Sequence, residues 1–154
     1  MRINAFSDVC LRVLMILASA PHDGLQTSRV IAAEIDIPYN HVSKAVIRLR
    51  DQGLVDVVRG RSGGLRISEE GKRVSVGAVL RSLDTRTDVA DCRTPKGDCP
   101  LLAGCGLRVA LARAREAFYA ELDGVVISDL AGPGRIGSAF VDLQDLTIRP
   151  HPTA

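Results

Sequence analysis

The sequence predicts a mainly α-helical protein with one small β hairpin, followed by a cysteine-rich loop and a long helix. Two observations predict this fold class. Leu, Val and Ala are plentiful while aromatic residues make up only 3% of the chain, a composition that favours helices. Apolar residues also recur at helical spacing in several stretches. The 154 residues suffice for one compact domain with a modest core and an appended element.

The first helix is expected from Phe6 to Ser19, before a proline that ends it. Its apolar stripe includes Cys10, which we interpret as a buried residue of the core. The stretch imitates a signal peptide, but Asp8 and Arg12 lie at the edge of its apolar part and inside it. No apolar run in the sequence is long enough to cross a membrane. We therefore expect a cytoplasmic protein with no membrane partner.

Two short helices with a tight connection are expected next. The first runs from about Thr27 to Ile35, and the second begins after Pro38 and ends near Gly53. One face of the second helix is apolar at i, i+3, i+4 and i+7 spacing. Its other face carries mostly hydrogen-bond donors and cations, among them Asn40, His41, Ser43, Lys44 and Arg48. This arrangement matches a helix-turn-helix, so we expect these five side chains to reach DNA.

A hairpin follows, with strands at 54–58 and 65–67 joined by a glycine-rich turn. A hairpin directly after a helix-turn-helix is a wing. Its tip carries the predicted DNA-contacting residues Arg59, Arg61, Gly63 and Gly64. Residues 44–66 have a local charge excess of +4, against +2 for the whole chain. A surface hairpin with solvated arginines is the alternative for the wing alone, but the preceding helix-turn-helix favours DNA binding.

One further helix is expected after Ser68, running to about Leu83. A long helix should then extend from Leu107 to Leu122, with an apolar stripe that a single small domain can barely cover. The alternatives are packing on its own domain or a two-fold homodimer, which we favour. The predicted division of the chain is a winged helix-turn-helix domain at 1–83, a cysteine-rich loop at 84–106, a dimerisation region at 107–131, and a mobile tail without assigned function at 132–154.

Three of the four cysteines, Cys92, Cys99 and Cys105, gather in one loop rich in Pro, Gly and charged residues. Thiolates on a loop suit a soft metal centre, most plausibly iron–sulfur, with a fourth ligand still to be found. Six and five residues separate successive cysteines, which is wide for structural zinc. Zinc and a redox thiol switch remain open as alternatives.

Several residue groups along the chain have an informative order and spacing. Besides the cysteine loop they are Phe6-Ser7-Asp8 with Leu11-Arg12, Asn40-His41-Val42 with Lys44, Arg59-Gly60 with Gly63-Gly64-Leu65, Ala117-Phe118 with Glu121-Leu122-Asp123, and Ser128-Asp129-Leu130. Together these groups resemble the NsrR repressors, which belong to a wider winged-helix family that includes IscR. The resemblance covers about residues 1 to 130.

The resemblance implies a homodimeric transcription repressor that carries one 4Fe–4S cluster per subunit. It further implies that nitrosylation of the cluster by nitric oxide abolishes binding to a double-stranded DNA operator. The implied cluster ligands are Cys92, Cys99, Cys105 and, from the other subunit, Asp8. IscR-type members instead use a histidine shortly after the third cysteine, where this chain has Arg108. The six-residue spacing between the first two cysteines is longer than the five or fewer usual in that family.

Two other functions stay open at this point. One is a regulator of the same fold with a 2Fe–2S cluster, sensing redox state or iron–sulfur supply. The remoter one is a metal or cluster carrier or an enzyme. The sequence shows no phosphate-binding glycine motif, no pairing of histidine with carboxylate and no nucleophile constellation, so we do not expect an enzyme.

Overall fold

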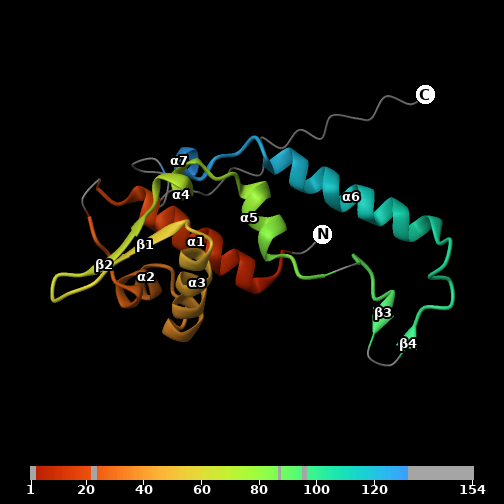
Figure 1. Ribbon diagram of the computed structural model, residues 1–154, viewed down its shortest axis with the longest axis horizontal. Helices are drawn as coiled ribbons and strands as arrows, with labels where there is room; N and C mark the ends of the chain where they lie inside the picture. Colours follow the sequence, from red (N-terminus) through yellow and green to blue (C-terminus); the bar gives the residue numbers. More distant parts are fainter. Residues whose placement is uncertain (1–2, 22–23, 87, 95–96, 132–154) are drawn as a thin grey trace.

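The computed structural model describes residues 3–21, 24–86, 88–94 and 97–131, and the predicted tail at 132–154 lies outside these ranges. Its elements in chain order are α1 (Ala5–Ser19), α2 (Ser28–Glu34), α3 (Tyr39–Asp51), β1 (Val55–Val58), β2 (Gly64–Ile67), α4 (Glu69–Arg73), α5 (Val76–Leu83), β3 (Arg93–Thr94), β4 (Gly97–Asp98), α6 (Gly106–Leu122) and α7 (Ile127–Leu130). The mainly α-helical class with a small β wing is confirmed (Figure 1). Among the described residues no helix is long and apolar enough to cross a membrane.

Helix α1 runs through the middle of the core, and its predicted range is confirmed to within a residue. Asn4 caps it, because its side-chain oxygen accepts hydrogen bonds from the N–H groups of Phe6 and Ser7 at 2.7 and 3.3 Å. Cys10 is completely buried in the apolar stripe, as expected. Burial raises the pKa of the Cys10 thiol to about 12, so this thiol stays protonated and serves the core.

The helix-turn-helix and the wing are also as predicted. Thr27 caps α2 by accepting from the N–H of Val30 at 3.3 Å, and Asp36 turns the chain with a φ of 52° before α3. The buried face of α3 consists of Val42, Ala45, Val46 and Leu49. Strands β1 and β2 pair in antiparallel fashion, from Val55 opposite Ile67 to Val58 opposite Gly64. We refer to residues 5–83 as the winged helix unit.

The prediction of one helix from Ser68 to Leu83 is wrong, because two helices fill this range. Ser68 caps α4 and Ser75 caps α5, each by accepting from a backbone N–H three residues ahead. Val74 between them is extended. Its carbonyl accepts from the N–H of Ile127 at 3.1 Å, and the N–H of Val76 donates to the carbonyl of Val125 at 2.8 Å. This pairing with a distant segment overrides the local helical pattern.

Helix α6 occupies the predicted range and crosses α5 with its C-terminal half, while its N-terminal half extends away from the winged helix unit (Figure 1). The close crossing depends on Gly77 of α5, since a Cβ there would lie 2.3 Å from the carbonyl oxygen of Tyr119. Arg81 of α5 ties the helices together by donating to Glu116 at 2.8 Å and to Asp123 at 2.7 Å. We call residues 84–118 the cysteine arm. The short elements β3, β4 and α7 were not predicted from the sequence.

Candidate nucleic-acid interface and metal centre

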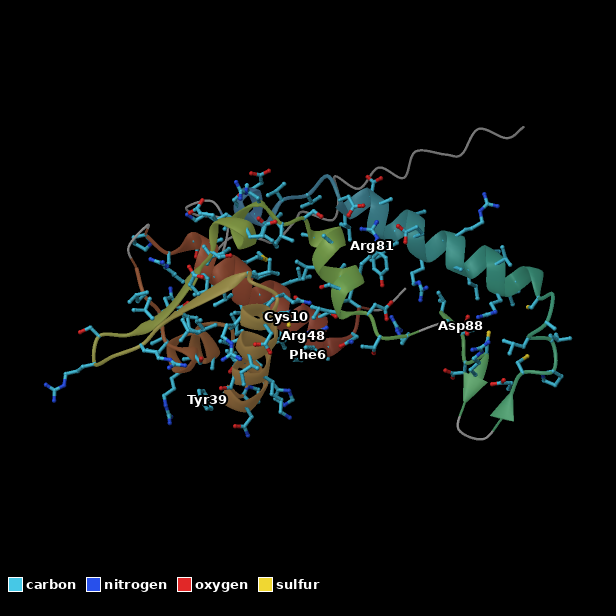
Figure 2. All side chains as sticks on the ribbon, in the orientation of Figure 1. Phe6, Cys10, Tyr39, Arg48, Arg81 and Asp88 are labelled. Atoms are coloured by element: carbon cyan, nitrogen blue, oxygen red, sulfur yellow. The ribbon has the colours of Figure 1, made fainter. Side chains whose placement is uncertain are left out.

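The N-terminal half of α3 presents a polar surface formed by the predicted DNA-contacting residues. Asn40, His41 and Lys44 are exposed, and Ser43 is half-buried. Two neighbours were missed from the sequence: the guanidinium of Arg29 on α2 lies 5.1 Å from the ring centroid of the exposed Tyr39. Figure 2 shows Tyr39 at the lower end of α3, away from the core. An aromatic residue directly after a helix-initiating proline is the signal that could have pointed to it.

Arg48 is placed differently from these residues. It lies in the C-terminal half of α3, and one of its terminal nitrogens donates to the carbonyl of Ser82, at the end of α5, at 3.2 Å. The amide of Gln52 donates to the hydroxyl of the same serine at 3.1 Å. The C-terminal end of α3 is therefore hydrogen-bonded to the last turn of α5 through two side chains.

The wing tip combines exposed cations with a backbone that requires glycine. Arg59 and Arg61 are both exposed. Gly60 has a φ of 122°, a conformation that other residues rarely adopt. A Cβ on Gly63 would lie 2.3 Å from the carbonyl oxygen of Val58, and a Cβ on Gly64 would lie 3.0 Å from that of Gln26. Gly63 and Gly64 are therefore required by the wing's own backbone packing, and Arg59 and Arg61 supply the exposed charge at its tip.

The three loop cysteines line a single cavity of about 200 Å³ at the N-terminal end of α6. The small β3–β4 ribbon brings the first two together, pairing Arg93 with Asp98, and the N–H of Cys99 donates to the carbonyl of Cys92 at 3.0 Å. The ribbon thereby absorbs the long spacing between these cysteines. The remaining cavity walls come from both sides of the loop and from α6: Ala90, Asp91, Leu101, Leu107, Arg108 and Leu111.

Charged groups surround the thiols. Cys105 occupies the N-cap of α6. The pKa of Cys92 is raised by partial burial and then by the negative charges of Asp88 and Cys99, against the opposing effect of Arg108. Three thiols in one cavity resist being ionised together unless a cation binds among them.

The donor set has the chemistry of an iron–sulfur site. The three thiols line one cavity, and thiolates are the usual protein ligands of iron–sulfur clusters. In a cluster the thiolates bind different iron atoms, so they need not converge on one point. The three cysteines therefore fit the ligand set of such a cluster.

Asp8 is not brought to the cysteine cavity within one chain. Its carboxylate accepts from the Nε of Arg12 at 2.9 Å, and its side chain is 47% exposed. It borders an open groove with Arg86, formed otherwise by the first residues of the described chain.

Comparison with known proteins agrees with this architecture. Residues 3–133 match the Rrf2 family, described as an iron-dependent transcriptional regulator. The HTH-type transcriptional repressor NsrR of Streptomyces coelicolor is 43% identical over 145 residues, which cover 89% of this chain and 95% of that protein. The HTH-type transcriptional regulator NsrR of Geobacillus kaustophilus is 33% identical and covers 84% of this chain and 89% of its own length.

Solved structures share the fold at lower identity. The oxidised form of CymR from Staphylococcus aureus superposes with a TM-score of 0.65 at 23% identity, covering 86% of this chain and 98% of that one. IscR of T. potens gives a TM-score of 0.64 at 18% identity, covering 84% of this chain and 85% of that one. At these identities the likeness establishes the winged-helix architecture.

Proposed function

This chain belongs to the Rrf2 family of transcriptional regulators, and from that premise we propose that it is a homodimeric repressor that senses nitric oxide through a 4Fe–4S cluster. The observation that carries the proposal is the cavity lined by Cys92, Cys99 and Cys105 at the end of a helix that crosses the DNA-binding unit. Intact holo-protein binds an operator, and protein whose cluster has reacted with nitric oxide does not.

The DNA-binding part rests on two surfaces. Asn40, His41 and Lys44 at the start of α3 are exposed, and in a helix-turn-helix this part of the recognition helix contacts base edges in the major groove. Arg59 and Arg61 of the wing contact the phosphate backbone or the minor groove. Ser43 and Arg48 belong to the same proposed DNA-contacting surface. Arg48 also holds α3 against α5 through its hydrogen bond to the carbonyl of Ser82.

The cluster is held by the three cavity thiolates and by Asp8 of the partner subunit. Support for a ligand from the partner is that Asp8 lies on an open groove and not on the cysteine cavity of its own chain. A carboxylate oxygen is a harder ligand than a thiolate, so the iron it binds is the one most open to exchange. When bound, the cluster supplies the iron that reacts with nitric oxide.

Exposed apolar side chains at the N-terminal end of α6 support dimerisation. Leu101, in the loop before α6, and Leu107, in its first turn, are 70% and 67% exposed. A second copy that packs against this end in a two-fold interface would cover them.

The link between cavity and DNA runs through packed and hydrogen-bonded groups. The hydroxyl of Tyr119 on α6 donates to Asp84 at 2.6 Å, and Arg115 donates to the carbonyl of Arg86 at 3.0 Å. These contacts fix the first residues of the cysteine arm against α6. Because Ser82 at the end of α5 is held by Arg48 of α3, a displaced arm shifts the recognition helix, which biases the dimer between two arrangements.

The proposal is tested first by non-denaturing mass spectrometry on protein purified without oxygen. We expect a dimer with one 4Fe–4S cluster per subunit. The mass of a 2Fe–2S cluster would instead favour a regulator that senses redox state or iron–sulfur supply. Bound zinc, or protein without metal, would refute the iron–sulfur cluster.

The second test is an electrophoretic shift with a DNA duplex that the holo-protein selects from a random pool. Stoichiometric nitric oxide should abolish the shift. Metal-free protein treated in the same way is the control, and a holo-protein shift that nitric oxide leaves unchanged would refute the sensing mechanism.

A further inference from the structure

Asp88 forms a charged pair with Arg108, and Arg108 lines the cysteine cavity while Asp88 lies behind it. The Nε of Arg108 donates to Oδ1 of Asp88. The Asp88 side chain is only 9% exposed, and that of Arg108 is 33% exposed. The other carboxylate oxygen of Asp88 is buried without a hydrogen-bond partner among the described residues. Figure 2 shows Asp88 at the point where the chain enters the cysteine loop.

Such a pair costs folding free energy. A buried carboxylate with one unpaired oxygen loses its hydration without replacing it, and one ion pair with a partly exposed partner contributes little to stability. Asp84 at the base of the arm is similarly buried, with its side chain 10% exposed, but its two carboxylate oxygens accept hydrogen bonds from Arg86 and Tyr119. Asp88 differs because one of its oxygens has no partner among the described residues. The arrangement therefore points to a positioning role for the pair.

The position of Arg108 identifies what it faces. It lies in the first turn of α6, three residues after Cys105 at the N-cap, and it lines the cavity that all three thiols share. Cys92 and Cys105 both raise the pKa of Arg108, after the larger effect of its hydrogen bond to Asp88. No other arginine or lysine lines this cavity among the described residues.

We propose that Arg108, held in place by the buried carboxylate of Asp88, is the cation that balances the thiolate charge at the cavity and is needed to retain the cluster. This inference rests on the proposed function, since it concerns the same cavity. Three thiolates leave a cluster with negative charge in a half-buried site, and a guanidinium beside the sulfurs offsets it and can donate hydrogen bonds to them. Asp88 acts only through Arg108, by fixing the direction of the guanidinium.

The test measures the rate at which holo-protein loses visible absorbance when excess EDTA is added without oxygen. Loss of an outer group that orients or balances a metal site commonly weakens it roughly 10- to 100-fold, and we expect Arg108→Gln to release iron faster by a factor in that range. Arg108→Lys keeps the charge and should restore much of the retention. Arg113→Gln, an exposed arginine of the same helix outside the cavity, should behave as wild type.

A double substitution separates the two members of the pair. Asp88→Asn alone should accelerate release, but by less than Arg108→Gln, because the cation remains without its anchor. In the Arg108→Gln background, Asp88→Asn should not increase the rate of cluster loss any further. Thermal unfolding of the metal-free proteins checks that each variant folds.

The outcomes distinguish this inference from the proposed function. Wild-type protein with a cluster, combined with unchanged release from Arg108→Gln, overturns the role of Arg108 and leaves the sensor intact. Tighter retention in Asp88→Asn than in wild type overturns the anchoring role. Wild-type protein that takes up no cluster refutes the proposed function, and the inference falls with it.

Discussion

The winged helix unit and the cysteine arm differ in what holds them together. The buried hydrophobic core lies almost entirely between Val9 and Leu83, with Tyr119 and Ile127 added from the far end of the chain. From residue 84 to residue 118, no described hydrophobic residue is buried. Burial of apolar surface is the main source of folding free energy. The winged helix unit is therefore held mainly by the buried core, to which Tyr119 and Ile127 contribute, whereas the shape of the arm depends on ion pairs and hydrogen bonds.

The sharpest way to break this comparison is to remove one thiol from each region. Cys105→Ser should abolish cluster binding completely, because it removes a ligand from the cavity, while the metal-free winged helix unit unfolds at an unchanged temperature. Cys10→Ala should keep the cluster, since Cys10 is buried in the core. Visible absorbance and calorimetry measure both effects. Cluster loss in Cys10→Ala alone would contradict the assignment.

Leucine truncation should show the opposite asymmetry. Leu14→Ala empties a completely buried site, so we expect the free energy of unfolding of the metal-free protein to fall by about 2–5 kcal/mol. Leu107→Ala should cost far less in dilute metal-free protein, because Leu107 is 67% exposed. Urea unfolding at several protein concentrations provides the measurement. A large loss in Leu107→Ala only at high concentration would locate that residue in the dimer interface.

The C-terminal end of α6, which follows the cysteine arm, packs on the winged helix unit at Gly77, and a methyl group there should push α5 and α6 apart. Gly77→Ala places a Cβ against the backbone of α6, and overpacking of this kind costs about 1–3 kcal/mol. Gly124→Ala is the matched control, because a Cβ at Gly124 meets nothing within 4 Å. Unfolding free energies of the two variants should differ clearly, and equal values would mean that the helices part without cost.

The regional differences also explain how far the sequence could predict the structure. Helices α1, α3 and α6 and the wing follow from local signals, namely apolar periodicity, caps and a glycine-rich turn. The break at Val74 depends on hydrogen bonds to Val125 and Ile127, which no local pattern reveals.

The site was predicted in the same partial way. Cysteine clustering and the charge patterns of α3 and the wing pointed to the residues that line the two surfaces. The grip of Arg48 on Ser82 and the pair of Asp88 with Arg108 each join distant parts of the chain. Such contacts become visible only when the fold has placed them.

The hydrogen bond from Tyr119 to Asp84 holds the first residues of the cysteine arm, and substitution of Tyr119 tests how much it contributes to stability. Burial and the hydrogen bond to Asp84 raise the pKa of Tyr119 to about 12. Because the folded-state pKa exceeds the unfolded value of about 10, this contribution to stability is complete below pH about 10 and is lost as the pH rises through about 12. Tyr119→Phe should lower the free energy of unfolding at pH 7 by about 1–3 kcal/mol and remove that pH dependence.

The exposed Tyr39 supplies the control for this experiment. Tyr39→Phe should leave both the stability at pH 7 and the alkaline loss unchanged. Unfolding curves at pH values from 7 to 12 compare the variants. An alkaline transition that persists in Tyr119→Phe would assign it to another group.

The smallest effect is expected at the wing, which lies far from the arm. Arg61→Ala should weaken binding to all DNA sequences alike and reduce the slope of log K against log salt by about 0.9, the value for one lost phosphate contact. Arg73→Ala, an exposed arginine on α4, should leave the slope unchanged. Fluorescence anisotropy at several salt concentrations measures it. A changed base preference with an unchanged slope would instead make Arg61 a base-reading residue.

The glycine contact between α5 and α6 also has a mechanical meaning. Helix α6 has 17 residues, so it is a stiff rod about 25 Å long, pinned near one end by the crossing at Gly77 and bearing Cys105 at the other. By the geometry of such a rod, a tilt of roughly 10° at the pinned end moves the far tip by roughly 4 Å. In the proposed sensor the crossing would therefore act as the fulcrum of a lever, through which a small displacement of the cysteine end of α6 would turn α5, the helix that Arg48 of α3 contacts.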